Sequence, residues 1–188
     1  MEKLPYYILN EQRRNKLPIY SYTVPEFVSY QMNMPIHNEQ RELVYLLKKT
    51  RHRFLTQIAH MLLRYGMPYC YQVQTQDKIP IYKIECLFTG FRYTLLNCST
   101  SEKLSINQHR TQLIEKIQTV TINGDVYRLE KDYACTGELK KNDETIATIR
   151  NLDNVSTSLT NRIRIEAIDD KTAALAAVLY HTFIYFGA

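Results

Sequence analysis

The sequence predicts an α+β fold that is mainly β: an antiparallel barrel of about twelve strands around a buried hydrophobic C-terminal helix, with an additional N-terminal helix. Three observations lead to this prediction. Short runs of alternating apolar and polar residues recur between residues 69 and 169, as in β-strands. A segment with a helical period lies before them, over residues 38–65, and an almost unbroken apolar run, residues 173–186, follows them.

The composition is that of one globular domain. The 188 residues are enough for a substantial core, and the fractions of 45% hydrophobic and 23% charged residues are those of an ordinary soluble protein. Fifteen tyrosines and no tryptophan favour a sheet, because aromatic side chains pack well on strands. We expect residues 1–18 to be an N-terminal extension and residues 19–188 to form a single barrel domain.

Two short strands are expected at the start of the barrel. Residues 19–24 alternate with period two, and residues 27–32 do so to a lesser degree. Pro25 and Pro35 place both strands at edges, because proline cannot donate a hydrogen bond to a ladder.

Residues 38–66 are the predicted helical insertion. Their apolar residues recur at steps of three and four, and Gly66 and Pro68 close the segment. The apolar positions are Leu43, Leu47, Phe54, Ile58, Met61, Leu62 and Tyr65. The basic run over residues 48–53 leaves an alternative, in which residues 43–47 form a strand and residues 54–65 form a shorter helix.

The other strands follow at short intervals and are separated by polar turns. Asn123-Gly124 is a strong signal for a two-residue type I′ hairpin. The expected strands cover residues 69–74, 79–86, 91–95, 103–106, 115–122, 126–129, 134–139, 145–149 and 162–168. Such a series is typical of an antiparallel barrel or sandwich.

The last strand runs into the central helix, which is predicted over residues 169–186. Asp169 or Asp170 can cap this helix, and Gly187 ends it. A helix without a polar stripe is buried in protein or in lipid, and this one is shorter than the roughly 20 residues of a transmembrane segment. A barrel of about a dozen strands has a lumen that a helix about 10–12 Å wide can fill. His181 is then expected to be a hydrogen-bonded histidine of the core.

Residues 67–186 have the layout of a meandering antiparallel sheet whose last strand feeds a hydrophobic helix. The pattern includes Tyr71-Gln72-Val73, Ile81-Tyr82-Lys83-Ile84, Phe91-Arg92-Tyr93-Thr94-Leu95, Leu104-Ser105-Ile106, Val126-Tyr127-Arg128-Leu129, Gly137-Glu138-Leu139 and Ile146-Ala147-Thr148-Ile149. In these features the chain resembles the tubby C-terminal superfamily, with its LURP-one-related and phospholipid-scramblase-like relatives, as a compact bacterial-type member. The resemblance implies a twelve-stranded barrel threaded by its C-terminal helix. Residues 38–65 have no place in that layout, and no phosphoinositide-binding residue is carried over to this chain.

The most concentrated charge lies in the basic run over residues 48–53. On a helix, Lys48, Lys49, Arg51 and Arg53 would share one broad face, and each could add about 1 kcal/mol of attraction to an anionic surface. With the net charge of +5, they are the candidate residues for binding an anionic lipid surface or an acidic protein. A solvated helix face explains the same run without any partner.

The sequence contains no catalytic, cofactor or metal motif of the kinds G-x-S-x-G, glycine-rich phosphate loop or H-E-x-x-H. We therefore expect no cofactor and no metal, and a non-enzymatic binding or scaffolding module. The alternative is a small enzyme or small-molecule carrier that uses a pocket at the barrel mouth. Nucleic-acid binding is not expected, because the charge is modest and no basic-aromatic strand motif occurs.

The cysteines predict a reducing environment. Cys70, Cys86, Cys98 and Cys135 form no C-x-x-C pair, and the first residues contain no apolar signal core. We expect a cytoplasmic protein with four reduced thiols.

Overall fold

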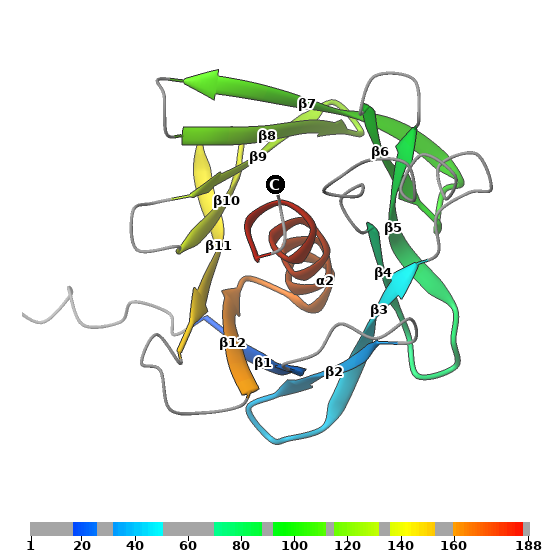
Figure 1. The fold of residues 1–188 in the computed structure, drawn as a ribbon, viewed down its shortest axis with the longest axis vertical. Coiled ribbons are helices and arrows are strands. Elements are labelled where there is room, and N and C mark those ends of the chain that lie inside the picture. Colours follow the sequence, from blue (N-terminus) through cyan, green and yellow to red (C-terminus); the bar gives the residue numbers. More distant parts are fainter. Residues whose placement is uncertain are drawn as a thin grey trace, which may run out of the picture.

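The computed structural model describes residues 17–25, 32–50, 70–87, 92–111, 115–131, 136–152 and 160–185. They form twelve strands and one helix, which are drawn in Figure 1. The strands are β1 (Ile19–Pro25), β2 (Asn33–Asn38), β3 (Leu43–Thr50), β4 (Cys70–Gln74), β5 (Pro80–Leu87), β6 (Arg92–Asn97), β7 (Glu102–Thr111), β8 (Glu115–Ile122), β9 (Asp125–Lys131), β10 (Gly137–Lys141), β11 (Glu144–Asn151) and β12 (Thr160–Ala167). The helix α2 (Asp170–Tyr180) continues into a π-helical turn, η1 (His181–Tyr185).

The strands form one closed barrel, in which neighbours along the chain are antiparallel neighbours in the sheet. The barrel closes between its first and last strands, where β1 pairs with β12 along its whole length, from Ile19 opposite Glu166 to Pro25 opposite Thr160. The seam between β1 and β2 is short and comprises Tyr20 opposite Asn38 and Ser21 opposite His37. The twelve-stranded antiparallel barrel predicted from the sequence is confirmed.

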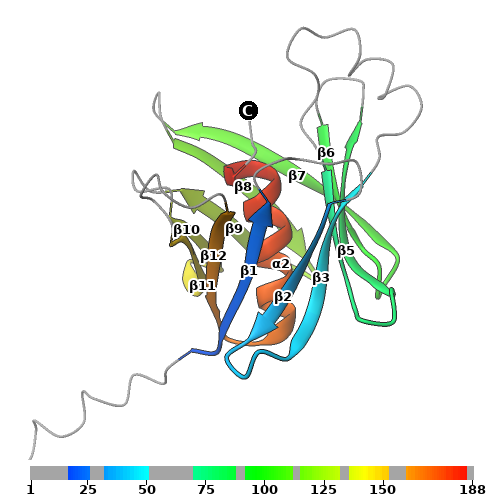
Figure 2. The same cartoon turned by 60° about the horizontal axis from the view of Figure 1, so that its bottom comes forward.

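The helix α2 occupies the lumen, as Figures 1 and 2 show from two directions. Asp169 caps it, because its side chain accepts a hydrogen bond from the backbone N–H of Thr172 at 2.7 Å. Every residue from Thr172 to Phe183 is buried. The predicted central helix is therefore confirmed, with Asp169 rather than Asp170 as its cap.

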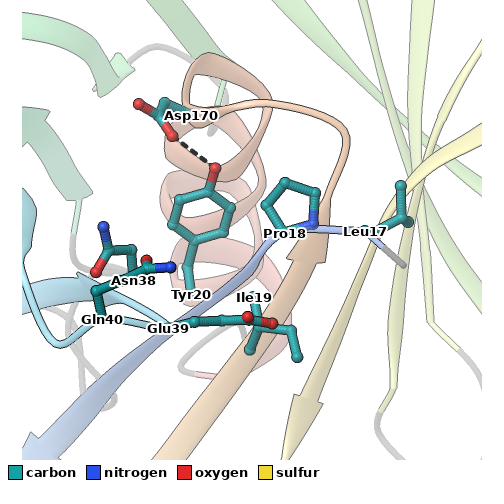
Figure 3. Close-up of a pocket in the computed structure, with 8 residues that line it drawn as sticks. All are labelled: Leu17, Pro18, Ile19, Tyr20, Asn38, Glu39, Gln40 and Asp170. Carbon is teal, nitrogen blue, oxygen red and sulfur yellow. Dashed lines mark hydrogen bonds between the residues drawn. The ribbon is translucent and has the colours of Figure 1, made fainter. Parts of the chain in front are cut away.

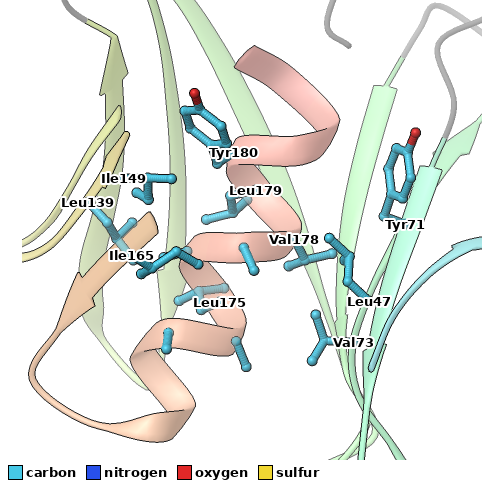
Figure 4. Close-up of a cluster of buried hydrophobic side chains, with 14 of the residues drawn as sticks. Leu47, Tyr71, Val73, Leu139, Ile149, Ile165, Leu175, Val178, Leu179 and Tyr180 are labelled. Atoms are coloured by element: carbon cyan, nitrogen blue, oxygen red, sulfur yellow. The ribbon is translucent and has the colours of Figure 1, made fainter. Parts of the chain in front are cut away.

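Side chains from both sides of the barrel converge on α2 in Figure 4. Small alanines on the helix leave room for the larger residues of the wall, and a Cβ on Gly137 would lie only 2.7 Å from the ring of Tyr180. The contacting residues that Figure 4 labels are Leu47, Tyr71, Val73, Leu139, Ile149 and Ile165 of the wall and Leu175, Val178, Leu179 and Tyr180 of the helix. Helix and wall form one hydrophobic core.

The prediction of one helix over residues 38–66 is wrong, because residues 43–50 form strand β3. The side chains of Tyr45, Leu47 and Lys49 alternate into the barrel. A spacing of four residues, as between Leu43 and Leu47, fits one face of a strand as well as one face of a helix, so the sequence pattern was ambiguous. The alternative strand over residues 43–47 is confirmed and extends to Thr50, whereas the shorter helix over residues 54–65 lies outside the described residues.

The two prolines do not mark edges of the sheet, because the barrel is closed. Pro25 ends β1, and Pro35 lies in β2 opposite Leu46 of β3. On its other side Pro35 lies beyond the short β1–β2 ladder, where a missing N–H costs no ladder hydrogen bond. The strand predicted over residues 27–32 falls almost entirely outside the described residues.

His181 lies inside the barrel, fully buried among tyrosine rings. Its ring stacks on Tyr185, with centroids 5.1 Å apart, and meets the edge of Tyr71 at 4.4 Å. Its Nδ1 lies 3.3 Å from the hydroxyl of Tyr22. Burial lowers its pKa to about 3, so the imidazole is neutral in the folded protein. The prediction of a hydrogen-bonded core histidine is confirmed.

Removing residues 173–188 is expected to abolish the cooperative fold. The buried side chains of Leu175, Val178, Leu179 and Phe183 contribute roughly 1.5–3 kcal/mol each, so the helix supplies an amount comparable to the whole net stability of about 5–15 kcal/mol of a typical domain. Circular dichroism and thermal melting should show an insoluble or molten chain, whereas Lys171→Ala, at the exposed start of the same helix, should melt like the parent protein. A soluble truncated chain with an unchanged melt would show that the helix is dispensable.

Stability should decline in mild acid because of His181. Its folded pKa lies below the unfolded value of about 6.5, so its contribution is present above pH 6.5 and is lost progressively as the pH falls towards 3. At pH 5 the loss is about 2 kcal/mol by linkage. Urea unfolding of His181→Phe should show a flatter dependence between pH 7 and 5 than the parent, and His37→Gln in β2 is the control. Equal slopes for His181→Phe and the parent would contradict this assignment.

Candidate functional site

The barrel has two chemically different ends. Because neighbouring strands are antiparallel, successive connections alternate between them. The end where α2 begins, here called the helix-start end, carries tight turns between the strands. All described residues with positive φ lie in these turns: Arg41, Lys78, Ser101, Asn123, Gly124, Asn142 and Asp143. The opposite end, where η1 finishes, is called the helix-finish end.

A pocket of about 400 Å³ opens at the helix-start end. Figure 3 shows its lining, which combines an apolar strip from the chain entering β1 with polar groups from the β2–β3 turn and the first residue of α2. These residues are Leu17, Pro18, Ile19, Tyr20, Asn38, Glu39, Gln40 and Asp170. The pocket thus forms only when the first strand meets the start of the last helix.

One hydrogen bond fixes this meeting point. The hydroxyl of Tyr20 donates to Oδ1 of Asp170 at 2.6 Å, across 150 positions of sequence. On the turn side, the amide of Asn38 donates to the carboxylate of Glu42 at 2.8 Å and accepts from the Glu42 backbone N–H at 2.9 Å. Both sides of the pocket are therefore held by specific hydrogen bonds.

Tyrosines surround the carboxylates at this end. Burial and the hydrogen bond to Asp170 raise the pKa of Tyr20 well above its usual range. Burial raises the pKa of Tyr45, with a further contribution from Asp170 and Asp169, and it raises the pKa of Tyr82 with contributions from Tyr127 and Asp169. These phenols stay protonated, so they act as hydrogen-bond donors rather than as bases or nucleophiles.

The lining of the pocket suits hydrogen bonding better than catalysis. Carboxylates and amides are present, but no nucleophile with an adjacent base lies among the described lining residues. In the described part of the chain, no three His, Cys, Asp or Glu residues are grouped closely enough to hold a metal ion. The chemistry that this pocket offers is recognition of a small polar molecule.

The candidate residues of the basic run do not share a helix face. Lys48 and Lys49 are successive residues of β3, so Lys48 points outward and is exposed, whereas Lys49 points into the barrel and is 8% exposed. Burial lowers the pKa of Lys49. Arg51 and Arg53 lie outside the described residues. Of the four, the structure assigns only Lys48 to the described outer surface.

The helix-finish end carries exposed cations. Near the ends of the strands here, among the residues whose side chains are described, the exposed charged ones are basic: Lys48, Arg92, Lys131, Arg150 and Arg162. The described carboxylates at the same level are ion-paired: Glu85 to Lys83 at 2.7 Å, Glu130 to Arg128 at 2.6 Å, and Glu138, whose side chain is 46% exposed, to Lys140 at 3.6 Å. Lys48, Arg92, Lys131 and Arg150 form no ion pair with another described residue.

Carboxylates outnumber cations at the helix-start end. The acidic residues there are Glu39, Glu42, Asp77, Glu102, Asp125, Asp143, Glu144, Asp169 and Asp170, and the basic ones are Arg41, Lys78, Lys103, Lys141 and Lys171. Negative charge therefore lies near the positive end of the α2 dipole, and positive charge lies near its negative end. This separation of charge could not be predicted from the sequence, because it depends on the end of the barrel at which each strand begins.

The thiols are packed in the described structure. Cys70 and Cys86 are buried, Cys98 is half-buried, and all three are free, while Cys135 lies outside the described residues. Burial raises the pKa of Cys86 and that of Cys70, the latter to about 12, so these thiols are poor nucleophiles at neutral pH.

Two features escaped the sequence analysis. Asp169 and Asp170 were expected only as helix caps, yet Asp170 also lines the pocket with Tyr20. The arginines of β12 belong to the strand predicted over residues 162–168, but the sequence does not reveal which residues lie beside them. In both cases the sequence does not reveal which strand, distant along the chain, lies beside these residues in the folded barrel.

Among the described residues no helix is long and apolar enough to cross a membrane. Comparison with known proteins gives one match: the sequence model of the tubby C-terminal like domain matches residues 20–186. No curated protein and no solved structure matches significantly. The family match spans the twelve strands and the helix almost completely, and the closed barrel around a C-terminal helix agrees with it. The chain belongs to the tubby C-terminal-like family.

Proposed function

We propose that this protein is a non-enzymatic binding module whose helix-finish end docks on an anionic lipid surface. The family assignment supports a binding or scaffolding role. The observation that carries the proposal is the separation of charge along the barrel axis: the exposed charged side chains described at the helix-finish end are cations, whereas carboxylates outnumber cations at the helix-start end. A surface that meets this end encounters exposed basic side chains, whereas the described carboxylates at the same level, Glu85, Glu130 and Glu138, are engaged in ion pairs.

The arrangement of the cations suits a flat partner. Lys48, Arg92 and Lys131 belong to β3, β6 and β9, which are spaced around the barrel rather than grouped on one wall. Each Lys or Arg near an anionic membrane contributes about 1 kcal/mol, and the attraction falls off within a Debye length of about 8 Å at physiological salt. Arg51 and Arg53 follow directly after β3 in the sequence and are proposed to add to this surface. Buried Lys49 is not proposed as part of it.

Reversing the three cations should abolish vesicle binding. Lys48→Glu, Arg92→Glu and Lys131→Glu combined remove about 3 kcal/mol of attraction before repulsion is counted, which is about a hundredfold in affinity. The measurement is co-sedimentation with vesicles of neutral lipid, with and without anionic lipid, at low and high salt.

The matched control makes the same charge change at the opposite end, with Lys78→Glu, Lys103→Glu and Lys171→Glu. This control variant should still bind anionic vesicles, with a somewhat lower affinity because its net positive charge is smaller. Equal loss in both triple variants, or equal binding to neutral vesicles by the parent protein, would contradict docking through the helix-finish end.

A small-molecule carrier is the second candidate function, and the pocket at the helix-start end is the observation that favours it. The pocket presents the carboxylates of Glu39 and Asp170 and the amides of Asn38 and Gln40 beside an apolar strip. A lining rich in acceptors suits a ligand that carries N–H donors.

The carrier function predicts that a polyamine probe such as spermidine shifts the backbone amide resonances of residues 38–40. Asp170→Asn should weaken that response at least tenfold, because it removes the charge while keeping the shape, and Asp77→Asn in the β4–β5 turn is the matched control. Shifts of the same size in both variants, or shifts spread over all acidic turns, would indicate nonspecific attraction and would contradict a carrier pocket for amines.

A further inference from the structure

The outer wall of the barrel over β11, β12 and β1 presents a group of arginines, here called the arginine face. Arg150 of β11 lies directly opposite Arg164 of β12 in the ladder. Arg162 lies two residues before Arg164 and therefore points to the same side. On the other flank, Ser21 and Thr23 of β1 lie opposite Arg164 and Arg162. Three guanidinium groups and two hydroxyls thus share one continuous outer surface.

This arrangement concentrates positive charge on one part of the wall. Like charges directly opposite each other on neighbouring strands are destabilising. Glu166 forms an ion pair with Arg164, from its Oε1 to Nη2 at 3.1 Å. Glu138 lies one strand further away, opposite Thr148, and contacts Lys140. The Nε of Arg164 has no hydrogen-bond acceptor among the described residues.

An exposed apolar residue adjoins the arginines. Leu152 is 48% exposed, and its backbone N–H donates to the carbonyl of Arg162 at 2.9 Å. Arginine and exposed apolar side chains together are the composition of a protein-binding surface, where Arg is enriched and apolar residues act as anchors.

We propose that the arginine face binds an extended acidic segment of a protein partner, with carboxylates on alternate residues. Residues i and i+2 of a strand lie roughly 6.6–6.8 Å apart on the same side, so Arg162 and Arg164 match alternate side chains of an extended peptide. The planar fork of each guanidinium can bind a carboxylate through two parallel hydrogen bonds. Leu152 then contacts an apolar side chain of the same segment.

The position of the face favours a protein segment over a membrane. Arg164 lies in the middle of β12 and not at its end, so its row of arginines runs along the barrel wall. A flat surface that touches the helix-finish end reaches the strand ends first, whereas an extended peptide can follow the wall. This inference rests on the general role as a binding module and assigns a second surface, which shares Arg150 and Arg162 with the helix-finish end and extends from it along the wall to Arg164.

A spacing-dependent peptide assay tests this proposal. The probes are three fluorescent peptides of equal length that contain one leucine: one with Glu on alternate residues, one with the same Glu residues in a consecutive block, and one with Gln in place of Glu. Fluorescence anisotropy with the full chain should show the alternating peptide binding at least tenfold more tightly than the block peptide, and the Gln peptide not binding. Equal affinity for the two acidic peptides would overturn the proposal.

Arg162→Gln with Arg164→Gln should lower the affinity for the alternating peptide at least tenfold. The matched control is Lys78→Gln with Lys103→Gln, which removes the same charge away from the face and should leave peptide affinity within about twofold. Melting curves verify the fold. If the double variant is destabilised, Arg150→Gln, which breaks no ion pair with another described residue, should still lower the peptide affinity at least threefold. No loss in any of these arginine variants would overturn the proposal.

Arg164→Gln alone separates the two surfaces, because Arg164 lies in the middle of β12 and not among the cations of the helix-finish end. It should weaken binding of the alternating peptide and keep the vesicle binding, since Lys48, Arg92 and Lys131 remain. Conversely, the triple reversal of those three cations should lose vesicle binding and keep the spacing preference for peptides. If Arg164→Gln loses vesicle binding as completely as the triple reversal does, the face belongs to the lipid surface and the proposal is wrong.

Discussion

Filling of the lumen is the constraint on which this structure depends. In a closed barrel every strand forms backbone hydrogen bonds with two neighbouring strands, so no edge of the sheet is open. Twelve strands, however, enclose a lumen that the side chains of the wall do not fill by themselves. The apolar helix α2 fills it and is buried on all sides from Thr172 to Tyr180. The fit is close, since Gly137 of the wall lies against the ring of Tyr180 with no room for a Cβ. Alanines at Ala173, Ala174, Ala176 and Ala177 let the larger wall residues approach the helix backbone.

The filled lumen determines where recognition can occur. An interior occupied by a helix excludes the deep central cavity that carriers with empty barrels use. What remains are the two ends and the outer wall, and these three surfaces differ in chemistry. The helix-start end is acidic and contains the pocket with Tyr20 and Asp170, the helix-finish end is basic, and the wall over β11 and β12 carries the arginine face. Acidic groups near the helix N-terminus and basic groups near its C-terminus also complement the helix dipole, so the charge separation agrees with the electrostatics of the fold.

The fold was largely predictable from the sequence, because its two strongest signals are periodic. The alternation in β12 runs directly into a helix without a polar stripe, and Asn123-Gly124 forms the expected two-residue turn with positive φ at both positions. The region of β3 was not predictable with the same certainty, since Leu43 and Leu47 satisfy the period of a strand and of a helix equally. The inward direction of Lys49 depends on the same assignment, because side chains alternate between the two faces only if residues 43–50 form a strand.

The proposed binding surfaces could not be predicted from the sequence, because each depends on a strand register that no local pattern contains. Tyr20 and Asp170 are 150 residues apart and meet only because β1 closes the barrel beside β12. Arg150 and Arg164 become neighbours through the β11–β12 ladder, in which a slip by one residue would turn one of them into the core. The buried isoleucines Ile149, Ile163 and Ile165 prevent that slip, since each must stay inside the barrel. The hydrophobic core therefore fixes the positions of the outward charges, and the same residues that fill the barrel also specify the spacing of the arginine face.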